Sequence, residues 1–578
     1  MTAHTSDILR KRGRVLFVIF FFLALGLTTK LYLVQVVHGD EFLEEANHQY
    51  TRPSGGLFNR GSIFFQDKNG QRVSAATLGS GFALTLNPSQ ITDAEDAYTK
   101  ISTLVDIDEG TFLSYADKTD DTYAVVAHRL DQKTADVLLA LDIDGVTLEK
   151  ERWRLYPGEE RAANTIGFVG FNGDEFAGRY GLEKYYERLL QRNDKKLYKN
   201  IFVEIFSTVQ DVARTQNEEG EGDVVTTIEP NVQGFLEDVL VKVDKELTPK
   251  TLGGIIIDPV TGAIYALAIL PTFNPNDFSG VTDPMVFGNP IVEGTFEMGS
   301  IMKPITMAAG LDAGVVTPDT TYTDKGFVEA NGYTIWNYDL KGRGPNTSMQ
   351  KVLGNSLNTG MAYVVSRLGN KRFTQYMNNF GLGIETGIDL PGEVPGNLKP
   401  LDTSRDIEHI TAGFGQGIAV TPIAMVRALS ALANGGKLIS PHVVQEIVYD
   451  LGFSKMTTHP EEKQVIQPKT SETITRMLVE VVDTYLLGGT VKKDTYAIAA
   501  KTGTAQIAKK GGSGYYDDRF LHSFFGYFPA YQPRFLVFFF AEEPHGTTFA
   551  SQTFTLPFMD TVDFLINYYQ IPPDRQQL

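Results

Sequence analysis

A serine and a lysine three residues apart, Ser300 and Lys303, are the first pair of side chains that could carry out covalent chemistry. Gly299 lets the chain turn, and the run after Ser300 is compatible with a helix that has Pro304 in its first turn, where a missing N–H has no cost. Residues three apart share a helix face, so the Lys303 amine can approach the Ser300 hydroxyl. A serine needs such a base to attack at neutral pH. We expect burial or a nearby positive charge to lower the pKa of Lys303.

A second motif, Ser356-Leu357-Asn358, adds a hydroxyl and a carboxamide. The Ser356 hydroxyl could relay a proton between Lys303 and a leaving amine. The Asn358 carboxamide could either fix the peptide bond of a substrate or hold Lys303. The residues themselves leave both roles open.

A third motif, Lys501-Thr502-Gly503-Thr504, is predicted at the end of a strand. Lys501 supplies a cation for a substrate carboxylate, and the two threonines supply hydroxyls for the same group. Gly503 would let a substrate backbone lie against the strand as an added strand. The backbone N–H groups of Ser300 and Thr504 would form an oxyanion hole.

Each of the three motifs is common by itself, but all three in this order, with glycine before the serine, rarely occur by chance. They therefore predict a single active site for acyl transfer. Its predicted catalytic residues are Ser300, Lys303, Ser356, Asn358 and Lys501, and its predicted substrate-binding residues are Thr502, Gly503 and Thr504.

The elements that must position these residues come from both ends of one domain. Two apolar runs, 253–258 and 263–270, flank the turn PVTG and predict a hairpin covered on both faces. Three more strands are expected at 496–506, 522–529 and 534–540, and a largely helical stretch is expected between the two groups, at 298–485. One sheet with helices packed on it follows. An amphipathic helix is predicted at 232–247, after a charged loop at 216–223.

Composition excludes several classes of protein. A chain of 578 residues exceeds a single core, so at least two domains are expected. The net charge of −18 opposes nucleic-acid binding, and the absence of cysteine excludes disulfides, thiolate metal sites and thiol nucleophiles. The 9 histidines, among them His442, His522 and His545, show no metal-ligand spacing. No metal and no cofactor are predicted.

The N-terminus carries a membrane signal. Four basic residues within 10–14 precede an apolar segment, 15–37, that is long enough to cross a bilayer. The basic cluster should stay in the cytoplasm, which places everything after residue 38 outside it. The alternative is a cleaved signal peptide. We expect a cytoplasmic tail at 1–14, an anchor at 15–37, an irregular, extended α+β module at 38–225 and a catalytic domain at 226–578.

With these motifs the chain resembles the class B penicillin-binding proteins, which are cell-wall DD-transpeptidases. The resemblance covers nearly the whole chain, and two residues depart from it, Met298 in place of proline and Ala500 in place of glycine. It implies an α+β fold with an N-terminal transmembrane helix, a pedestal module at 38–225, and a transpeptidase domain whose central antiparallel sheet is covered by helices. Besides the three motifs, it rests on RGSIFFQDKNG (60–70), YPGEERAANTIGFVG (156–170), GRYGLEKYYERLL (178–190), TTIEPNVQ (226–233), DPVTGAIYALAILPTFNPNDF (258–278) and GFGQGIAVTPIAMVRALSALANGG (413–436).

The resemblance also implies a reaction. Ser300 would attack the D-Ala-D-Ala bond of a peptidoglycan stem peptide, release D-alanine and pass the acyl group to an amine of a neighbouring stem. β-Lactams would trap the same serine. The segment 523–535 is more similar to the division type than to the elongation type. Such enzymes sit in the inner membrane with the catalytic domain outside, and they work beside a glycosyltransferase of the SEDS family and other cell-wall synthesis proteins.

Three alternatives remain at this stage. A β-lactamase shares the motifs but needs a carboxylate that activates a deacylating water, and Glu393 with Asn397 stand near the place for such a pair. A β-lactam sensor would carry further membrane or protease segments, and no H-E-x-x-H occurs. An inactive structural scaffold would be expected to lack one of the three motifs.

Overall fold

The computed structural model describes residues 58–172, 175–192, 220–450, 453–458, 463–509, 511 and 514–575. These residues form two compact units, one with residues 58–59 and 78–153 and the other with residues 60–77 and 154 onward. The chain passes between the units within β2 (Arg72–Leu86) and β4 (Val146–Leu155). Across these ranges no helix is both long and apolar enough to cross a bilayer. The predicted anchor at 15–37 lies outside the described residues.

The smaller unit packs three helices against strands. The distal part of β2 pairs with β3 in antiparallel fashion, and Leu84, Ile101 and Phe112 belong to their shared core. Each helix begins at an aspartate whose carboxylate accepts a backbone N–H three residues on, which satisfies a free donor of the first turn. Besides the strands that it shares, the unit contains η2 (Pro88–Gln90), α3 (Ala94–Ser102), α4 (Glu109–Ala116), β3 (Ala124–Leu130) and α5 (Gln132–Ala140).

The larger unit is built around a five-stranded antiparallel sheet, as the sequence predicts. Its order, β18-β19-β20-β8-β9, joins the early hairpin to the three late strands. The all-apolar runs arise because alternate side chains enter two different cores. Phe538 and Phe540 point into one core, and Phe539 points into the other. The strands are β8 (Thr251–Ile257), β9 (Ile264–Leu270), β18 (Ala499–Ala508), β19 (Tyr515–Phe528) and β20 (Phe535–Glu542).

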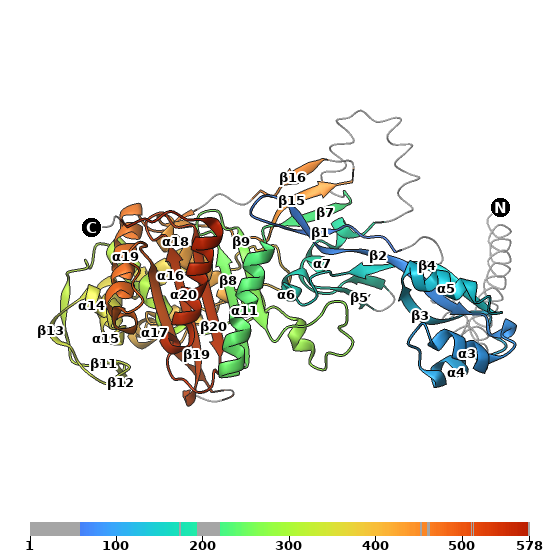
Figure 1. Ribbon diagram of the computed structural model, residues 1–578. Coiled ribbons are helices and arrows are strands. Elements are labelled where there is room, and N and C mark those ends of the chain that lie inside the picture. The colour runs from blue at the N-terminus through green and yellow to red at the C-terminus, as the bar shows by residue number, and fades with distance from the viewer. Residues whose placement is uncertain are drawn as a thin grey trace, which may run out of the picture. The chain divides into compact units, whose positions relative to one another are not determined.

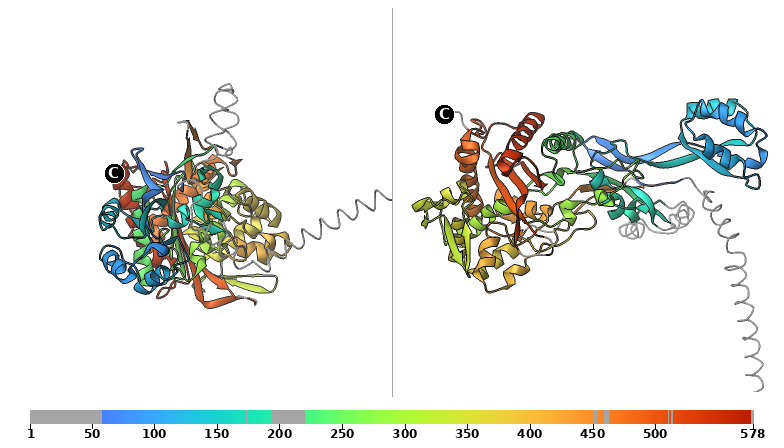
Figure 2. Two further views of the ribbon diagram at one scale, coloured as in Figure 1. Left: turned by 90° about the vertical axis from the view of Figure 1, so that its right-hand side faces the viewer. Right: turned by 90° about the horizontal axis from the view of Figure 1, so that it is seen from below.

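Helices cover both faces of this sheet (Figures 1 and 2). The predicted amphipathic helix is α11 (Pro230–Leu247), and it shares one core with α20 (Ala550–Tyr569). The opposite core contains helices from the middle of the chain. These are α13 (Lys303–Asp312), α14 (Met349–Gly354), α15 (Asn358–Leu368), α16 (Asn370–Asn379), α17 (Asp406–Ala412), α18 (Pro422–Ala433) and α19 (Pro468–Glu480).

The stretch 298–485 is less helical than expected. Short strand pairs interrupt it, and two of them lie between α13 and α14, where they support the candidate site described below. The strands in this stretch are β10 (Thr321–Asp324), β11 (Phe327–Ala330), β12 (Tyr333–Trp336), β13 (Gly344–Ser348), β14 (Lys437–Leu438), β15 (Val444–Tyr449), β16 (Ser454–Met456) and β17 (Lys463–Gln464).

A second sheet joins segments that are far apart in sequence. Within the larger unit its order is β16-β15-β7-β1-β2, so β7 (Gly222–Thr226) lies between β15 and β1 (Ile63–Gln66). The prediction of a loop at 216–223 is therefore wrong at Gly222 and Asp223, which pair with β15. The sequence did not reveal this strand, because its partner strand is far away in sequence. Residues 216–219 lie outside the described residues.

A buried ion cluster holds the N-terminal part of the larger unit together. Glu183, fully buried, accepts hydrogen bonds at 2.6 Å from both Arg60 and Arg154. Burial alone would raise the pKa of Glu183, but Arg154 and Arg60 outweigh it and lower that pKa. The remaining short elements of the unit are α6 (Ala163–Ile166), β5 (Val169–Asn172), β6 (Glu175–Gly178), α7 (Gly181–Tyr185), α8 (Glu187–Leu190), η3 (Pro284–Phe287), α12 (Pro290–Glu293), η4 (Gly299–Met302), η5 (Lys399–Asp402), η6 (Val481–Tyr485) and η7 (Leu486–Gly489).

Candidate active site

Ser300 lies on the short helical turn η4, directly before α13. Gly299 has a φ of +61°, a conformation that disfavours other residues, and its N–H donates to the Gly415 carbonyl at 3.0 Å. Pro304 stands in the first turn of α13, as the sequence predicts. The local chain therefore presents Ser300 at the N-terminal end of a buried helix.

The structure brings the lysines and serines of the three motifs together. The Lys303 ammonium nitrogen, Nζ, lies 2.6 Å from the Ser356 carbonyl oxygen and 3.1 Å from its Oγ. Nζ of Lys501 lies 3.0 Å from the same Oγ and 3.0 Å from the Thr502 carbonyl oxygen. Ser356 adopts a φ of +53°, which is uncommon for a serine and directs both its carbonyl and its hydroxyl at Lys303.

Both lysines are buried in a way that favours their neutral forms. Burial lowers the pKa of Lys303 well below its usual value, and the positive charge of Lys501 lowers it further. Burial lowers the pKa of Lys501 to about 7. No carboxylate is hydrogen-bonded to either amine within the described part of the chain. Both effects favour the neutral amine of Lys303, which is the form that a general base needs.

The Lys303 amine, which was expected to approach the Ser300 hydroxyl, is hydrogen-bonded to Ser356 in this structure. In free enzymes such catalytic contacts are often long and shorten when substrate binds. The three-residue spacing still places both side chains on the same helical segment, with Ser356 between the two lysines.

Asn358 does not hold Lys303. Its amide nitrogen donates to the Trp336 carbonyl at 2.9 Å, and Ser356 holds the lysine instead. The next residue after each of these two, Asn337 and Thr359, donates a hydrogen bond to the buried carboxylate of Asp324. This network fixes the start of α15 and was not predicted, because Asp324 and Trp336 lie on strands that local patterns did not reveal.

The third motif forms part of β18, an edge strand of the sheet. The Thr502 carbonyl accepts from Lys501 and so faces away from β19. Because backbone groups alternate along a strand, the N–H of Thr504 faces the same way. A Cβ at Gly299 would lie 2.9 Å from the Thr504 carbonyl group, so the turn before Ser300 abuts this strand edge. The Thr504 hydroxyl accepts from the Ala550 N–H at the start of α20.

The structure explains why position 503 needs a glycine, which the sequence did not indicate. A Cβ there would lie 2.8 Å from the Met298 carbonyl oxygen and 3.0 Å from the Ile301 nitrogen. It would also lie 2.3 Å from Oγ of Ser523, a fully buried serine. Ser523 is itself a site residue that sequence reasoning missed, although it is a polar residue in an otherwise apolar run, SFFGYF.

Glu393 and Asn397, the pair considered for a β-lactamase, have local roles. The Glu393 carboxylate accepts hydrogen bonds from Thr386 and from the Gly387 N–H. The Asn397 backbone pairs with Ala419. His522 is buried and bonded to Thr553, and within the described ranges no group of three or more His, Cys, Asp or Glu could hold a metal ion.

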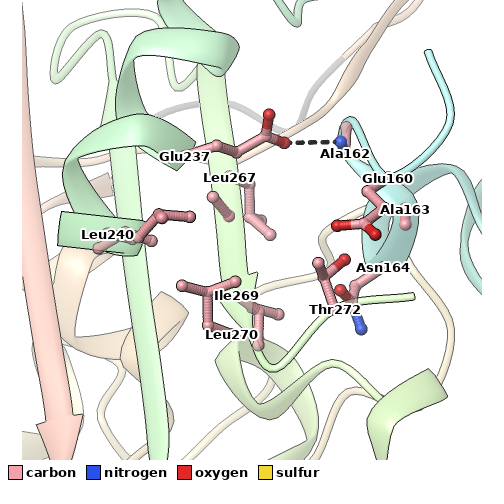
Figure 3. Close-up of a pocket in the computed structure, with 12 residues that line it drawn as sticks. Glu160, Ala162, Ala163, Asn164, Glu237, Leu240, Leu267, Ile269, Leu270 and Thr272 are labelled. Atoms are coloured by element: carbon pink, nitrogen blue, oxygen red, sulfur yellow. Dashed lines mark hydrogen bonds between the residues drawn. The ribbon is translucent and has the colours of Figure 1, made fainter. Parts of the chain in front are cut away.

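A pocket with a volume of about 90 Å³ lies beside β9, at the sheet edge opposite to β18 (Figure 3). One of its two lining glutamates, Glu237, accepts hydrogen bonds at 2.8 Å from the Ala162 N–H and from the Gln233 amide. Arg161 lies 3.5 Å from the same carboxylate. Glu237 is thus already paired, and the pocket is separate from the candidate active site.

Two known domain families match this chain. Residues 253–560 match the penicillin binding protein transpeptidase domain, and residues 58–204 match the penicillin-binding protein dimerisation domain. Stage V sporulation protein D of Bacillus subtilis is 30% identical over 95% of this chain and 85% of its own length. The "Peptidoglycan D,D-transpeptidase FtsI homolog" of Mesostigma viride is 27% identical over 97% of this chain and 96% of its own.

Solved structures share the fold. Penicillin binding protein 3 of Mycobacterium tuberculosis, complexed with aztreonam, is 23% identical and has a TM-score of 0.67 over 90% of this chain and 98% of that chain. Penicillin Binding Protein 2X of Streptococcus thermophilus is 19% identical, with a TM-score of 0.69 over 88% of this chain and 80% of that chain. The chain belongs to the class B penicillin-binding proteins and is more like their division type than their elongation type.

Proposed function

We propose that the protein is a membrane-anchored peptidoglycan DD-transpeptidase with Ser300 as its nucleophile. The observation that carries this proposal is the contact of Lys303, Ser356 and Lys501 in one buried cluster beside Ser300.

The first half-reaction forms an ester. Neutral Lys303 takes the hydroxyl proton as Ser300 Oγ attacks the carbonyl carbon between the two D-alanines. The N–H groups of Ser300 and Thr504 stabilise the oxyanion. Both lysines donate hydrogen bonds to Ser356 Oγ, so the hydroxyl proton of Ser356 is free to pass to the departing nitrogen. Lys303 returns its proton to Ser356 as the C–N bond breaks and D-alanine leaves.

The second half-reaction transfers the acyl group. The amine of a neighbouring stem peptide attacks the ester carbonyl, and the bond to Ser300 Oγ breaks. One proton of that amine returns to Ser300 Oγ through the same lysine and serine. A new peptide bond then joins the two stems, and the enzyme is regenerated.

The Lys501 motif would bind the terminal carboxylate of the donor. With a pKa of about 7, Lys501 is charged in half of the molecules at neutral pH, and a bound carboxylate would favour the charged form. The hydroxyls of Thr502 and Thr504 would complete this site. The Thr504 oxygen accepts from Ala550 in the free protein, so its own proton can point to a ligand.

β-Lactams should acylate the same serine. The solved relatives from Mycobacterium tuberculosis were crystallised with aztreonam and with ampicillin. A β-lactam presents an acyl carbon and a carboxylate to the same groups as the donor peptide. In this chain it would be attacked by Ser300 and held by Lys501.

The finer features are also proposals. Residues 15–37 would anchor the chain in the inner membrane, with a cytoplasmic tail at 1–14, a pedestal at 38–225 and a transpeptidase domain at 226–578 outside the cytoplasm. The apolar character of 15–37 and the basic residues before it support this topology. A SEDS-family glycosyltransferase at the division site would be the partner, as the resemblance to class B penicillin-binding proteins implies.

The test is labelling of the purified extracytoplasmic part with a fluorescent penicillin, followed by a chase with unlabelled drug. We expect a stable adduct in the natural sequence and none in Ser300→Ala. An adduct that hydrolyses within seconds would indicate a β-lactamase. Absence of an adduct in folded protein would contradict the proposed nucleophile chemistry.

A further inference from the structure

Ser523 connects two parts of the site that belong to different elements. It lies on β19 directly opposite Gly503 of β18. Its hydroxyl donates to the Met298 carbonyl at 2.8 Å and lies 3.4 Å from the Gly503 carbonyl. The Ser523 side chain therefore reaches past the empty position of Gly503 and binds the turn that carries Ser300.

This contact fixes a distance that matters for catalysis. The two proposed oxyanion donors are the N–H of Ser300, on the turn, and the N–H of Thr504, on the strand. Backbone groups of the turn and the strand are so close that a Cβ at Gly299 or Gly503 would approach them to within 3.0 Å. Ser523 is fully buried, so it cannot contact a substrate. Its hydroxyl can only hold the turn in place.

We infer that Ser523 is a positioning residue that sets the geometry of the oxyanion hole. This inference rests on the proposed function. The other side of the turn is held by Gly415, which accepts the Gly299 N–H, so Ser523 supplies the restraint on the strand side. Without its hydroxyl the Met298 peptide can rotate or shift, and the Ser300 N–H moves away from the oxyanion.

The expected effect is on chemistry rather than on binding. Loss of one oxyanion donor typically slows an acyl transfer by about 100- to 1000-fold, and a displaced donor should cost less. We expect Ser523→Ala to slow acylation by about 10- to 100-fold. The carboxylate site around Lys501 stays intact, so the dissociation constant of the initial complex should change by less than about threefold.

A matched control lies on the same strand. The hydroxyl of Tyr527 is fully buried and bonded to Thr475 at 2.8 Å, and it does not touch the turn before Ser300. Tyr527→Phe also removes one buried hydrogen bond from β19. It should lower the melting temperature about as much as Ser523→Ala does, while the acylation rate stays within twofold of the natural sequence.

The experiment measures acylation by a fluorescent penicillin over a range of drug concentrations and from pH 6 to 9. It yields the rate constant, the dissociation constant and the pH midpoint. The inference predicts a lower rate constant in Ser523→Ala only, with an unchanged pH midpoint because Lys303 is untouched. A rate within twofold of the natural sequence, an equal loss in Tyr527→Phe, or a shifted midpoint would overturn it. Failure of the natural sequence to acylate would instead refute the proposed function.

Discussion

Replacement of Lys501 by methionine should make the larger unit more stable while removing activity. Lys501 is buried, and its pKa is lowered from 10.5 to about 7. Each pKa unit corresponds to about 1.4 kcal/mol between the charged and neutral forms. At neutral pH Lys501 is protonated in the unfolded chain but in only about half of the folded molecules. Its burial therefore lowers the free energy of unfolding by about 4 kcal/mol. Methionine has a similar volume and carries no such cost.

The sign of the pH dependence follows from linkage. Between pH 7 and 10.5 the unfolded state binds more protons at Lys501 than the folded state does, so the natural protein gains stability as pH rises. The variant lacks this contribution. The free energy of unfolding of the variant should therefore exceed that of the natural protein most at pH 7 and below. This difference should decrease by about 3 kcal/mol by pH 9.5. Loss of the hydrogen bonds to Ser356 and Thr502 lowers this difference equally at every pH.

Urea unfolding followed by tryptophan fluorescence can measure this difference. The chain has 2 tryptophans, Trp153 and Trp336, and only Trp336 belongs to the larger unit. Both proteins should therefore carry Trp153→Phe, which leaves one reporter near the site. The reasoning fails if the free-energy difference between Lys501→Met and its parent is independent of pH between 7 and 9.5.

Three further predictions concern other buried charges. Lys303→Ala should slow acylation by about 100- to 10,000-fold, as expected for loss of a general base, and a wild-type rate in a penicillin-labelling assay would exclude that role. Glu183→Gln should lower the free energy of unfolding by about 3–5 kcal/mol, because it leaves the charges of Arg60 and Arg154 without their shared partner; urea unfolding measures this loss, and a change below 1 kcal/mol would contradict it. Burial raises the pKa of Asp389 to about 6, above its usual value, so this group stabilises the fold below about pH 4 and loses that effect as pH rises to 6. Relative to Asp389→Asn, the natural protein should lose about 3 kcal/mol as pH rises from well below 4 to well above 6, about 2 kcal/mol of it between pH 4 and 6, and parallel stability curves would refute this.

The sequence predicted the catalytic sheet and the order of the site motifs. The apolar runs at 253–258, 263–270 and 534–540 and the turn between the first two are local signals, and they correspond to strands of the sheet. The helix 232–247 was equally clear, because its apolar residues recur with helical spacing. Lys303 in the first turn after Ser300 also follows from local spacing.

Features that depend on distant partners were not predictable. β7 pairs with β15, whose residues lie more than 200 positions later, so nothing near Gly222 indicates a strand. The reason for Gly503 depends on Met298 and Ser523, which only the folded sheet brings near. The hydrogen bond from Asn358 to Trp336 likewise depends on a strand pair, β11 with β12, that interrupts the expected helical stretch.

The assembly of one sheet from both ends of the catalytic region has a kinetic consequence. β8 pairs with β20, and Leu252 lies opposite Ala541, almost 300 positions away. Contacts of such long range slow folding, because a large loop must close before the pairing can stabilise it. The strand with Lys501 can dock only after β19 and β20 have emerged. During synthesis the nascent chain thus exposes a long unpaired apolar edge, and acquisition of penicillin binding should mark the last stage of folding.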